Sequence, residues 1–382
     1  MYRFLVIIFL IFPILGFSQE KLNFQKTDSI SYQYYMNGEW KKLIELTKDA
    51  FKQNIDSKFM RQRAGYAYFM SGDYTAAGIQ FKRALAFDMT DEFTREYIYY
   101  AALNTAGENA RLYAENLPGE AATKLGIKKF IPIGMIDTEF NIKTNQVNNR
   151  SNQIYYRFGI NTDFGFRLSL YQAYAYYEQT FSGELTRQPE YFALLKWSLS
   201  PDWHVRAAYH RLFTTDANVS YPGNLGYTAL ASQVNRFNFE INMSLLKTSL
   251  ATTQQAGFQA SVVLPGRSNL YFTGSLIGMY ENRAFRTIYS QTAGLKCAKN
   301  LWAEGNITLG NLKNYSTYST LYIYNSIDPS VFRTGLSLIY YCGKHLTFVG
   351  NFTFDQQEIL NNTTNKYFYY QYSYSGGLKW RL

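Results

Sequence analysis

Long hydrophobic runs are missing from most of this 382-residue sequence. Beyond residue 19, no apolar stretch approaches the roughly 20 residues that a membrane-spanning helix requires. Histidine occurs only three times, lysine and arginine form no block, and neither a zinc-ligand spacing nor an RNA-recognition signature is present. We therefore expect no metal site, no cofactor and no nucleic acid partner.

Cysteine is almost absent too, with only Cys297 and Cys342, each beside a short turn ("CAKN" and "CGKH"). On the strand pattern described below, the two lie two strands apart on one rim, roughly 10 Å at the usual strand spacing. That distance exceeds the ~7 Å limit for a disulfide. We expect two free thiols at the rim or on the lipid side.

The N-terminus reads "MYRFLVIIFLIFPILGFSQ", with Arg3 before an apolar stretch and small residues before Gln19. This pattern predicts a secretory signal peptide over residues 1–19. Tyrosine and phenylalanine are abundant (35 and 29), whereas mean hydropathy is only -0.27. Together these values favour a membrane β-barrel, with aromatic girdles outside and a wet lumen inside.

Residues 27–117 have helical periodicity that repeats after 34 residues, and this period is typical of tetratricopeptide repeats. The pairs are Tyr34 and Tyr68, Gly38 and Gly72, Trp40 and Tyr74, Ala50 and Ala84. The second unit resembles that family through Gly65, Tyr68, Ala77, Phe81 and Ala84, and departs from it at Arg61 and Met89. We interpret these side chains mainly as packing residues of a periplasmic segment over 20–125; its concave face can also hold a partner peptide.

From about residue 130, alternating patterns predict strands that continue to the C-terminus. The pattern indicates thirteen strands. Single-chain bacterial barrels contain an even number, so one strand is either missed or falsely included. We therefore predict a barrel of about 12–14 strands over residues 126–382. Short turns alternate with long polar loops, and "TTDANVSYPGNLGYTALASQ" and "GNLKNYSTYSTLYIYNSIDPS" are interpreted as two such loops. The chain between residues 217 and 264 is the least regular.

The last residues, "YSYSGGLKWRL", alternate apolar with polar side chains up to the end of the chain. Ser375, Gly377, Trp380 and Leu382 resemble the C-terminal signal of outer-membrane barrels. The resemblance implies that the barrel-assembly machinery reads this strand, by adding it to an open sheet edge.

Charged residues at inward positions of the predicted strands can line the lumen, and Glu240 and Glu304 can pair with the arginines across it. The set is Arg157, Lys196, Arg206, Glu240, Glu304 and Arg333, with Asp163, His204, His210, Lys296 and Asp355 at similar positions. Most of these side chains are expected to form the wall. His204 and His210, six residues apart on one strand, are ~20 Å apart and cannot share a catalytic site.

The order of the parts resembles bacterial outer-membrane proteins with a periplasmic tetratricopeptide segment and a C-terminal barrel, such as exopolysaccharide-export porins and YaiO-type barrels. This α + β layout implies export or transport across the outer membrane, linked to polysaccharide or secretion, with a periplasmic protein partner on the repeats and outer-membrane lipid around the barrel. A non-conducting scaffold of an envelope complex is one alternative. A lipid-modifying enzyme is another, although no G-x-S-x-G motif is present; we predict that the chain is not an enzyme.

Overall fold

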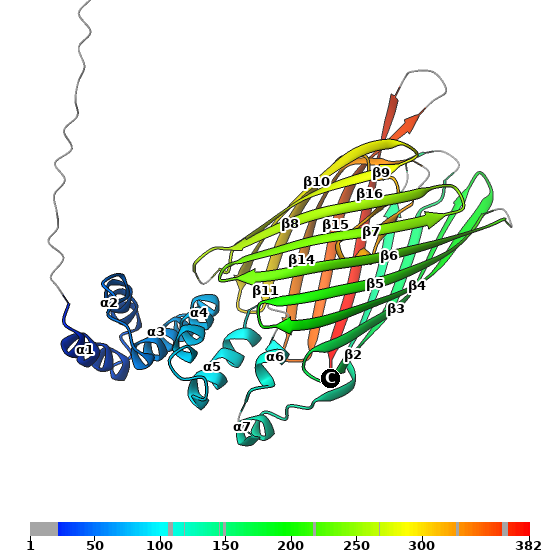
Figure 1. Cartoon of the computed structure of the whole chain (residues 1–382). Coiled ribbons are helices and arrows are strands. Elements are labelled where there is room, and N and C mark those ends of the chain that lie inside the picture. The colour runs from blue at the N-terminus through cyan, green and yellow to red at the C-terminus, as the bar shows by residue number, and fades with distance from the viewer. Residues whose placement is uncertain are drawn as a thin grey trace, which may run out of the picture.

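The computed structural model describes residues 22–382 apart from 106–109, 118, 145, 148–149, 217–218, 267, 326–327 and 361–365, so the predicted signal peptide lies outside the described residues. A helical segment comes first and a barrel second (Figure 1). None of the described helices is long and apolar enough to cross a membrane. The helices are α1 (Phe24–Met36), α2 (Trp40–Lys52), α3 (Lys58–Met70), α4 (Tyr74–Leu85), α5 (Glu92–Leu103), α6 (Ala110–Ala114) and α7 (Gly119–Lys124).

Small and aromatic side chains make up the core of the helical segment. Phe81 of α4 is fully buried, and its ring lies against Gly65 of α3, where an added Cβ would come within 2.7 Å of the ring. Ala77 and Ala84 are buried on the same helix, and Tyr68 is half buried. The 34-residue spacing is visible in the turns, since Gly38 and Gly72 both adopt positive φ between consecutive helices.

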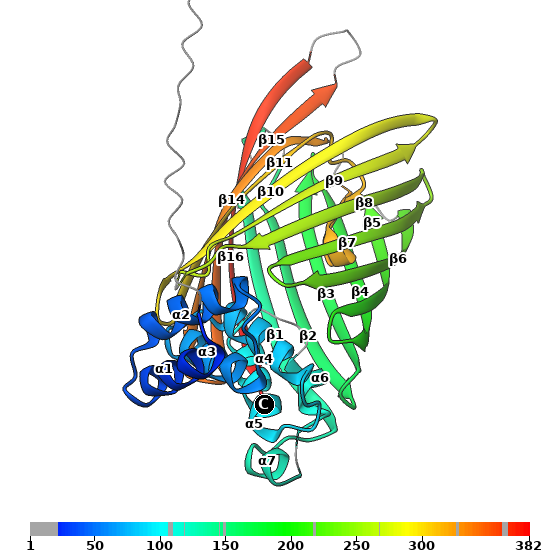
Figure 2. The same cartoon turned by 60° about the vertical axis from the view of Figure 1, so that its left-hand side comes forward.

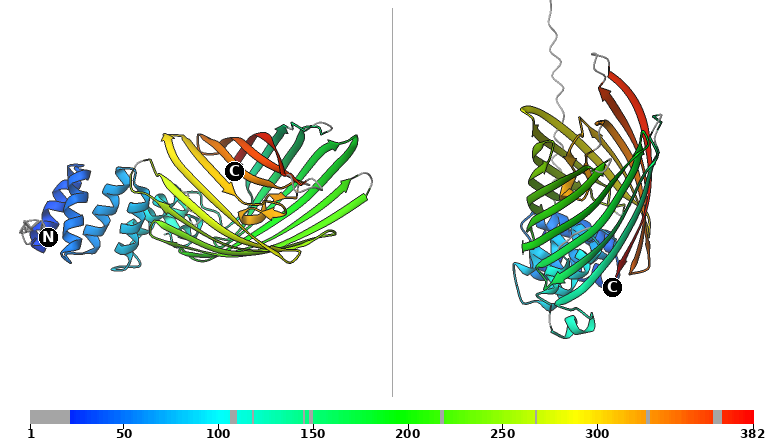
Figure 3. Two further views of the ribbon diagram at one scale, coloured as in Figure 1. Left: turned by 90° about the horizontal axis from the view of Figure 1, so that it is seen from above. Right: turned by 90° about the vertical axis from the view of Figure 1, so that its right-hand side faces the viewer.

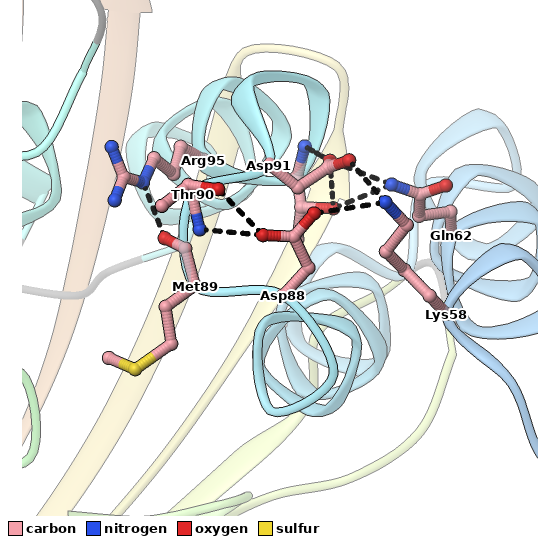
Figure 4. A network of polar contacts seen from close by, with 8 residues as sticks. Lys58, Gln62, Asp88, Met89, Thr90, Asp91 and Arg95 are labelled. Carbon is pink, nitrogen blue, oxygen red and sulfur yellow. Dashed lines mark hydrogen bonds and ion pairs between the residues drawn. The ribbon is translucent and has the colours of Figure 1, made fainter.

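A polar network fixes the position of α5 against α3 (Figure 4). Asp91 caps α5 by accepting from the Thr94 backbone N–H at 2.8 Å, and it also accepts from Gln62 at 2.7 Å. Lys58 reaches both Asp88 and Asp91, at 3.1 and 3.2 Å. The same carboxylate therefore stabilises the helix N-terminus and joins two helices.

The Asp88 carboxylate gives this network a defined pH dependence. Hydrogen bonds from Thr90 and Lys58 lower the pKa of Asp88 from 3.8 to about 2. Because the folded pKa is below the unfolded one, the stabilisation is complete above about pH 4 and is lost as the pH falls towards 2. We expect the difference in thermal stability between wild type and Asp88→Asn to be constant above pH 4 and to vanish near pH 2; a difference that grew on acidification would contradict this.

Fourteen antiparallel strands form a closed barrel in the described part of the chain, which confirms the predicted barrel. Each strand pairs with its neighbours along the chain, and β1 pairs with β16 to close the ring. The strands are β1 (Phe130–Thr144), β2 (Gln153–Phe164), β3 (Leu168–Phe181), β4 (Glu184–Ser200), β5 (Trp203–Asp216), β6 (Val219–Val234), β7 (Phe237–Thr248), β8 (Thr252–Val263), β9 (Tyr271–Glu281), β10 (Ala284–Ala298), β11 (Leu301–Leu309), β14 (Ser330–Cys342), β15 (Leu346–Leu360) and β16 (Lys366–Arg381).

The strand missing from the sequence prediction is β6, which occupies a stretch that we expected to be a long polar loop. That expectation was wrong because "YPGN" has the composition of a turn. Pro222 pairs with Phe213 of β5, but the pairing with β7 begins only at Gly223. The missing N–H of Pro222 therefore interrupts no ladder bond with β7.

The C-terminus and the end of the helical segment that leads into β1 lie at one rim of the barrel, here called the near rim (Figures 1 and 2). Ion pairs attach the helical segment to three successive turns of this rim. Arg167 contacts Glu115 at 2.8 Å, Asp202 contacts Lys82 at 2.6 Å and Arg236 contacts Asp73 at 2.9 Å. The first two pairs are exposed and contribute little stability each, whereas Arg236 and Asp73 are largely buried; together the three define how the segment sits on the rim. The helices extend away from the barrel beyond it (Figure 3).

Candidate functional site

The lumen is the candidate site, because a chain segment folds into it. Barrels of eight strands are filled by their own side chains, whereas those of 16–18 strands leave a channel, so a barrel of fourteen strands encloses more space than its wall can fill. Residues 310–325 and 328–329, between β11 and β14, enter from the far rim and lie inside the ring of strands (Figure 3, left). We call this stretch the plug segment; it includes β12 (Tyr315–Ser316), η1 (Tyr318–Thr320) and β13 (Ile323–Tyr324).

Two apolar clusters hold the plug segment against the wall. Leu321 and Ile323 pack on a cluster of β3–β7 that includes Phe192 and Leu225. Leu312 and Tyr315 are themselves buried in a second cluster; its other members are Ile277, Met279 and Ile288 of β9 and β10. Burial of each large apolar side chain contributes about 1.5–3 kcal/mol, so the segment is a folded part of the interior.

Polar contacts hold the tip of the plug segment. His210, which is 1% exposed, donates from Nδ1 to the Thr320 carbonyl at 2.8 Å, and its Nε2 lies 3.1 Å from Glu190. The Tyr322 hydroxyl donates to Glu139 of β1, which is four strands away around the ring from the β5 strand of His210. The tip is therefore attached to the wall at two separate places. Thr320 has a φ of 58°, which is uncommon for a β-branched residue and shows that the surrounding contacts determine its backbone.

Ion pairs line the wall around the plug segment. Arg157 lies 3.1 Å from Asp137 and 3.0 Å from Glu139, and Arg206 lies 2.6 Å from Glu240. On β15, Asp355 is fully buried and accepts from Arg333 at 3.0 Å and from Lys143 at 3.3 Å. Arg150 contacts Asp328 of the plug segment at 2.7 Å.

The structure brings only some of the predicted lumen charges together. Arg206 and Glu240 are partners, whereas Arg157 and Arg333 pair with Asp137, Glu139 and Asp355 rather than with Glu240 or Glu304. Lys196 is half buried on β4. Asp137 and Glu139 were missed, although alternation along "MIDTEFNIK" places both on the face that also carries Lys143.

A tyrosine reaches an acid across a glycine at two places in the wall. Tyr271 of β9 donates to Glu304 of β11 at 2.6 Å by crossing Gly294 of β10. Tyr171 of β3, which pairs with Asn161, reaches diagonally over Gly159 of β2 and donates to Asp137 of β1 at 3.1 Å. The glycines are required because a Cβ at position 294 would meet the Tyr271 ring at 2.5 Å.

This arrangement predicts that Gly294→Val displaces Tyr271 and leaves Glu304 without its donor. We expect a loss of about 1–3 kcal/mol in the free energy of unfolding, as is typical of overpacking. Gly305→Val is the matched control, since nothing lies within 4 Å of an added Cβ there. Urea unfolding in detergent micelles, followed by tryptophan fluorescence, checks both variants; equal stability of the two would contradict the proposed crossing.

The remaining predicted residues lie in the terminal strand and at the rim. Trp380 of β16 and Leu382, which follows the strand, are exposed, and Gly377 of β16 pairs with Glu139 of β1. Ser375 accepts from Asn351 at 2.8 Å. Cys297 and Cys342 are free and exposed, which confirms that expectation. Within the described ranges, no group of three or more His, Cys, Asp or Glu side chains is placed to hold a metal ion.

Comparison with known proteins identifies solved structures only; no family model and no curated protein matches the chain. A bacterial polysaccharide outer membrane secretin is 7% identical, with 66% of this chain and 99% of that chain covered and a TM-score of 0.42. The CymD monoaromatic hydrocarbon channel is 9% identical (66% and 89% covered, TM-score 0.47). The Pseudomonas putida toluene transporter TodX is 6% identical (69% and 93% covered, TM-score 0.45). At such identities these likenesses say nothing about substrates.

The location of the protein follows from the barrel itself. Within lipid, β-structure satisfies its backbone hydrogen bonds only as a closed barrel. The outward side chains here form an exposed apolar band, for example Ile241, Met243 and Leu245 on β7. Closed barrels with such a band belong to the bacterial outer membrane, with both termini on the periplasmic side. In barrels of this kind the short turns are typical of the periplasmic rim, and the near rim carries short turns such as residues 201–202.

Proposed function

We propose that the protein transports a solute or polymer across the outer membrane, through a lumen that the plug segment constricts. One observation carries this proposal: the plug segment enters the lumen as a connection between strands and is held there by side chains. A barrel that served only as an anchor needs no such segment, because fewer strands would fill their own interior. The link to polysaccharide export or secretion rests on the resemblance in layout.

The helical segment acts in this proposal as a periplasmic adaptor. It is attached to the rim through ion pairs such as Asp73 with Arg236, while α1 and α2 lie farthest from the barrel (Figure 1). A protein partner bound there would be placed at the periplasmic mouth. The exposed aromatic side chains Tyr32 and Phe59 offer contact area for it.

A scaffold without conductance is the second candidate, and the packing of the plug segment against the wall favours it, since the segment occupies the lumen. Single-channel recording of the whole protein in planar bilayers, with and without residues 22–125, separates the two candidates. Steady openings support transport. An inserted, heat-modifiable barrel that stays silent even without its plug segment would reject transport and leave the scaffold; the enzyme alternative has no supporting observation.

A further inference from the structure

A row of polar side chains interrupts the lipid-facing wall on β5–β7. Arg211 pairs directly with Asn224, and Asn224 pairs directly with Lys247, so the three are lateral neighbours on one face. This face is the outer one, because the sequence neighbours of the three residues are buried inside: His210, Leu225 and Leu246. Charged side chains on the lipid side need an explanation, since lipid cannot solvate them.

On β7 the row marks the upper margin of the apolar band, and on β5 only the aromatic Phe213 is exposed beyond Arg211. On β7 the outward residues before Lys247 are apolar, and Lys247 is followed by Thr248, the last residue of the strand. A lysine or arginine costs about 2–4 kcal/mol at the membrane midplane but only about 0–1 near the interface. The far rim, opposite the periplasmic one, faces the outside of the cell. The row thus lies at the headgroup level of the outer leaflet.

The side chains of the row present donors and positive charge. The Asn224 Oδ1 atom already accepts from Arg211 at 2.5 Å and from the Tyr209 hydroxyl at 2.6 Å. The side-chain amide of Asn224 therefore has its two N–H groups left to donate. Neither Arg211 nor Lys247 has a carboxylate partner among the described residues. The nearby Arg187 is balanced by Glu178 at 3.7 Å.

We propose that this row binds a phosphate group in the headgroup of an outer-leaflet lipid. Arg211 and Lys247 are two strands apart, which is about 10 Å at the usual strand spacing. Their long side chains can therefore both contact one phosphate, and the Asn224 amide between them can donate to it as well. A lipid is favoured over a soluble anion because apolar side chains surround the row. Phe213 lies 5.0 Å from the Arg211 guanidinium, and Leu245 is exposed below Lys247. The site does not depend on conductance through the lumen.

The test is native mass spectrometry of the whole protein in detergent, titrated with lipid A, which carries two phosphates, and with its dephosphorylated form. Lipid A should bind the wild type more tightly than the dephosphorylated lipid. The double variant Arg211→Gln with Lys247→Gln should bind lipid A about thirtyfold more weakly, from the usual contribution of two cations at a membrane surface. The matched control is Arg283→Gln with Lys344→Gln, which removes the same charge at two other turns and should bind like the wild type.

Three results would overturn the proposal. Equal binding of the two lipids would show that phosphate is not recognised. Equal loss in the control variant would show that only net charge matters. Full competition by inorganic phosphate at the concentration of the lipid would show a site for a soluble anion. Folding of each variant is checked first by the heat-dependent shift of the barrel in gel electrophoresis, and Asn224→Leu supplies a third, uncharged substitution that should also weaken binding.

Discussion

Replacing residues 315–324 by a short glycine-serine linker is expected to open the barrel. The replaced residues include the apolar anchors Tyr315, Leu321 and Ile323 and the tip that His210 and Glu139 hold. Because the wall of a barrel this wide does not fill the lumen, mean current in planar bilayers should rise by about an order of magnitude, with sustained openings. The ring of strands should persist, since none of the replaced residues pairs within it.

A single substitution tests the same point without shortening the chain. Leu321→Asp places an unpaired charge in the apolar cluster around Phe192 and Leu225, which is costly unless the tip leaves its site. The matched control is Leu250→Asp at a far turn, where the side chain is 81% exposed. We expect current from the first variant and wild-type behaviour from the second. If the loop replacement inserted normally and stayed silent, transport through this lumen would be rejected and the scaffold would remain.

Asp355→Asn is expected to cause the largest loss of stability of any single change in the wall. This fully buried carboxylate is the acid that both Arg333 and Lys143 contact, and Ser330 also donates to it at 3.0 Å. Removing one member of a buried ion pair leaves an uncompensated charge and costs about 3–5 kcal/mol. Urea unfolding in detergent micelles should show a loss of this size.

Two further variants show whether the stranded cations cause that loss. Asp355→Asn combined with Arg333→Met should cost less than the sum of the single changes, because one of the stranded charges is then gone. Asp202→Asn breaks the exposed pair with Lys82 and should cost below about 1 kcal/mol. If the losses in free energy of unfolding caused by Asp355→Asn and by Arg333→Met simply added in the double variant, Asp355 would stabilise the wall in some other way.

Local patterns predicted most of the barrel correctly. Alternation such as Phe237, Phe239 and Ile241 on β7 indicates both the strand and its lipid-facing side, because side chains alternate across a strand. The same rule failed for β6, where Pro222 and two glycines have the composition of a loop. That strand exists because β5 and β7 flank it and leave their edges to be paired, which is a property of the closed ring and not of the residues in the strand.

The candidate site was predictable only in part. Inward positions such as Arg206 and Glu240 follow from the period of the strands, and the polar stretch 310–330 was correctly interpreted as a long connection. Nothing in that stretch indicates that it folds inward. Its anchors, Phe192 for Leu321 and His210 for the Thr320 carbonyl, are more than 100 residues away in sequence.

The sequence by itself determined the class of protein. It indicates a helical segment followed by strands in which apolar and polar side chains alternate, and the apolar and aromatic faces of these strands indicate contact with lipid. These are local properties, since each side chain's face follows from its position in the strand. The tertiary structure decided the number of strands, the pairing of Arg157 with Asp137 and Glu139, and the entry of the plug segment into the lumen. All three depend on closing the ring, because closure sets the register between strands and the width of the interior.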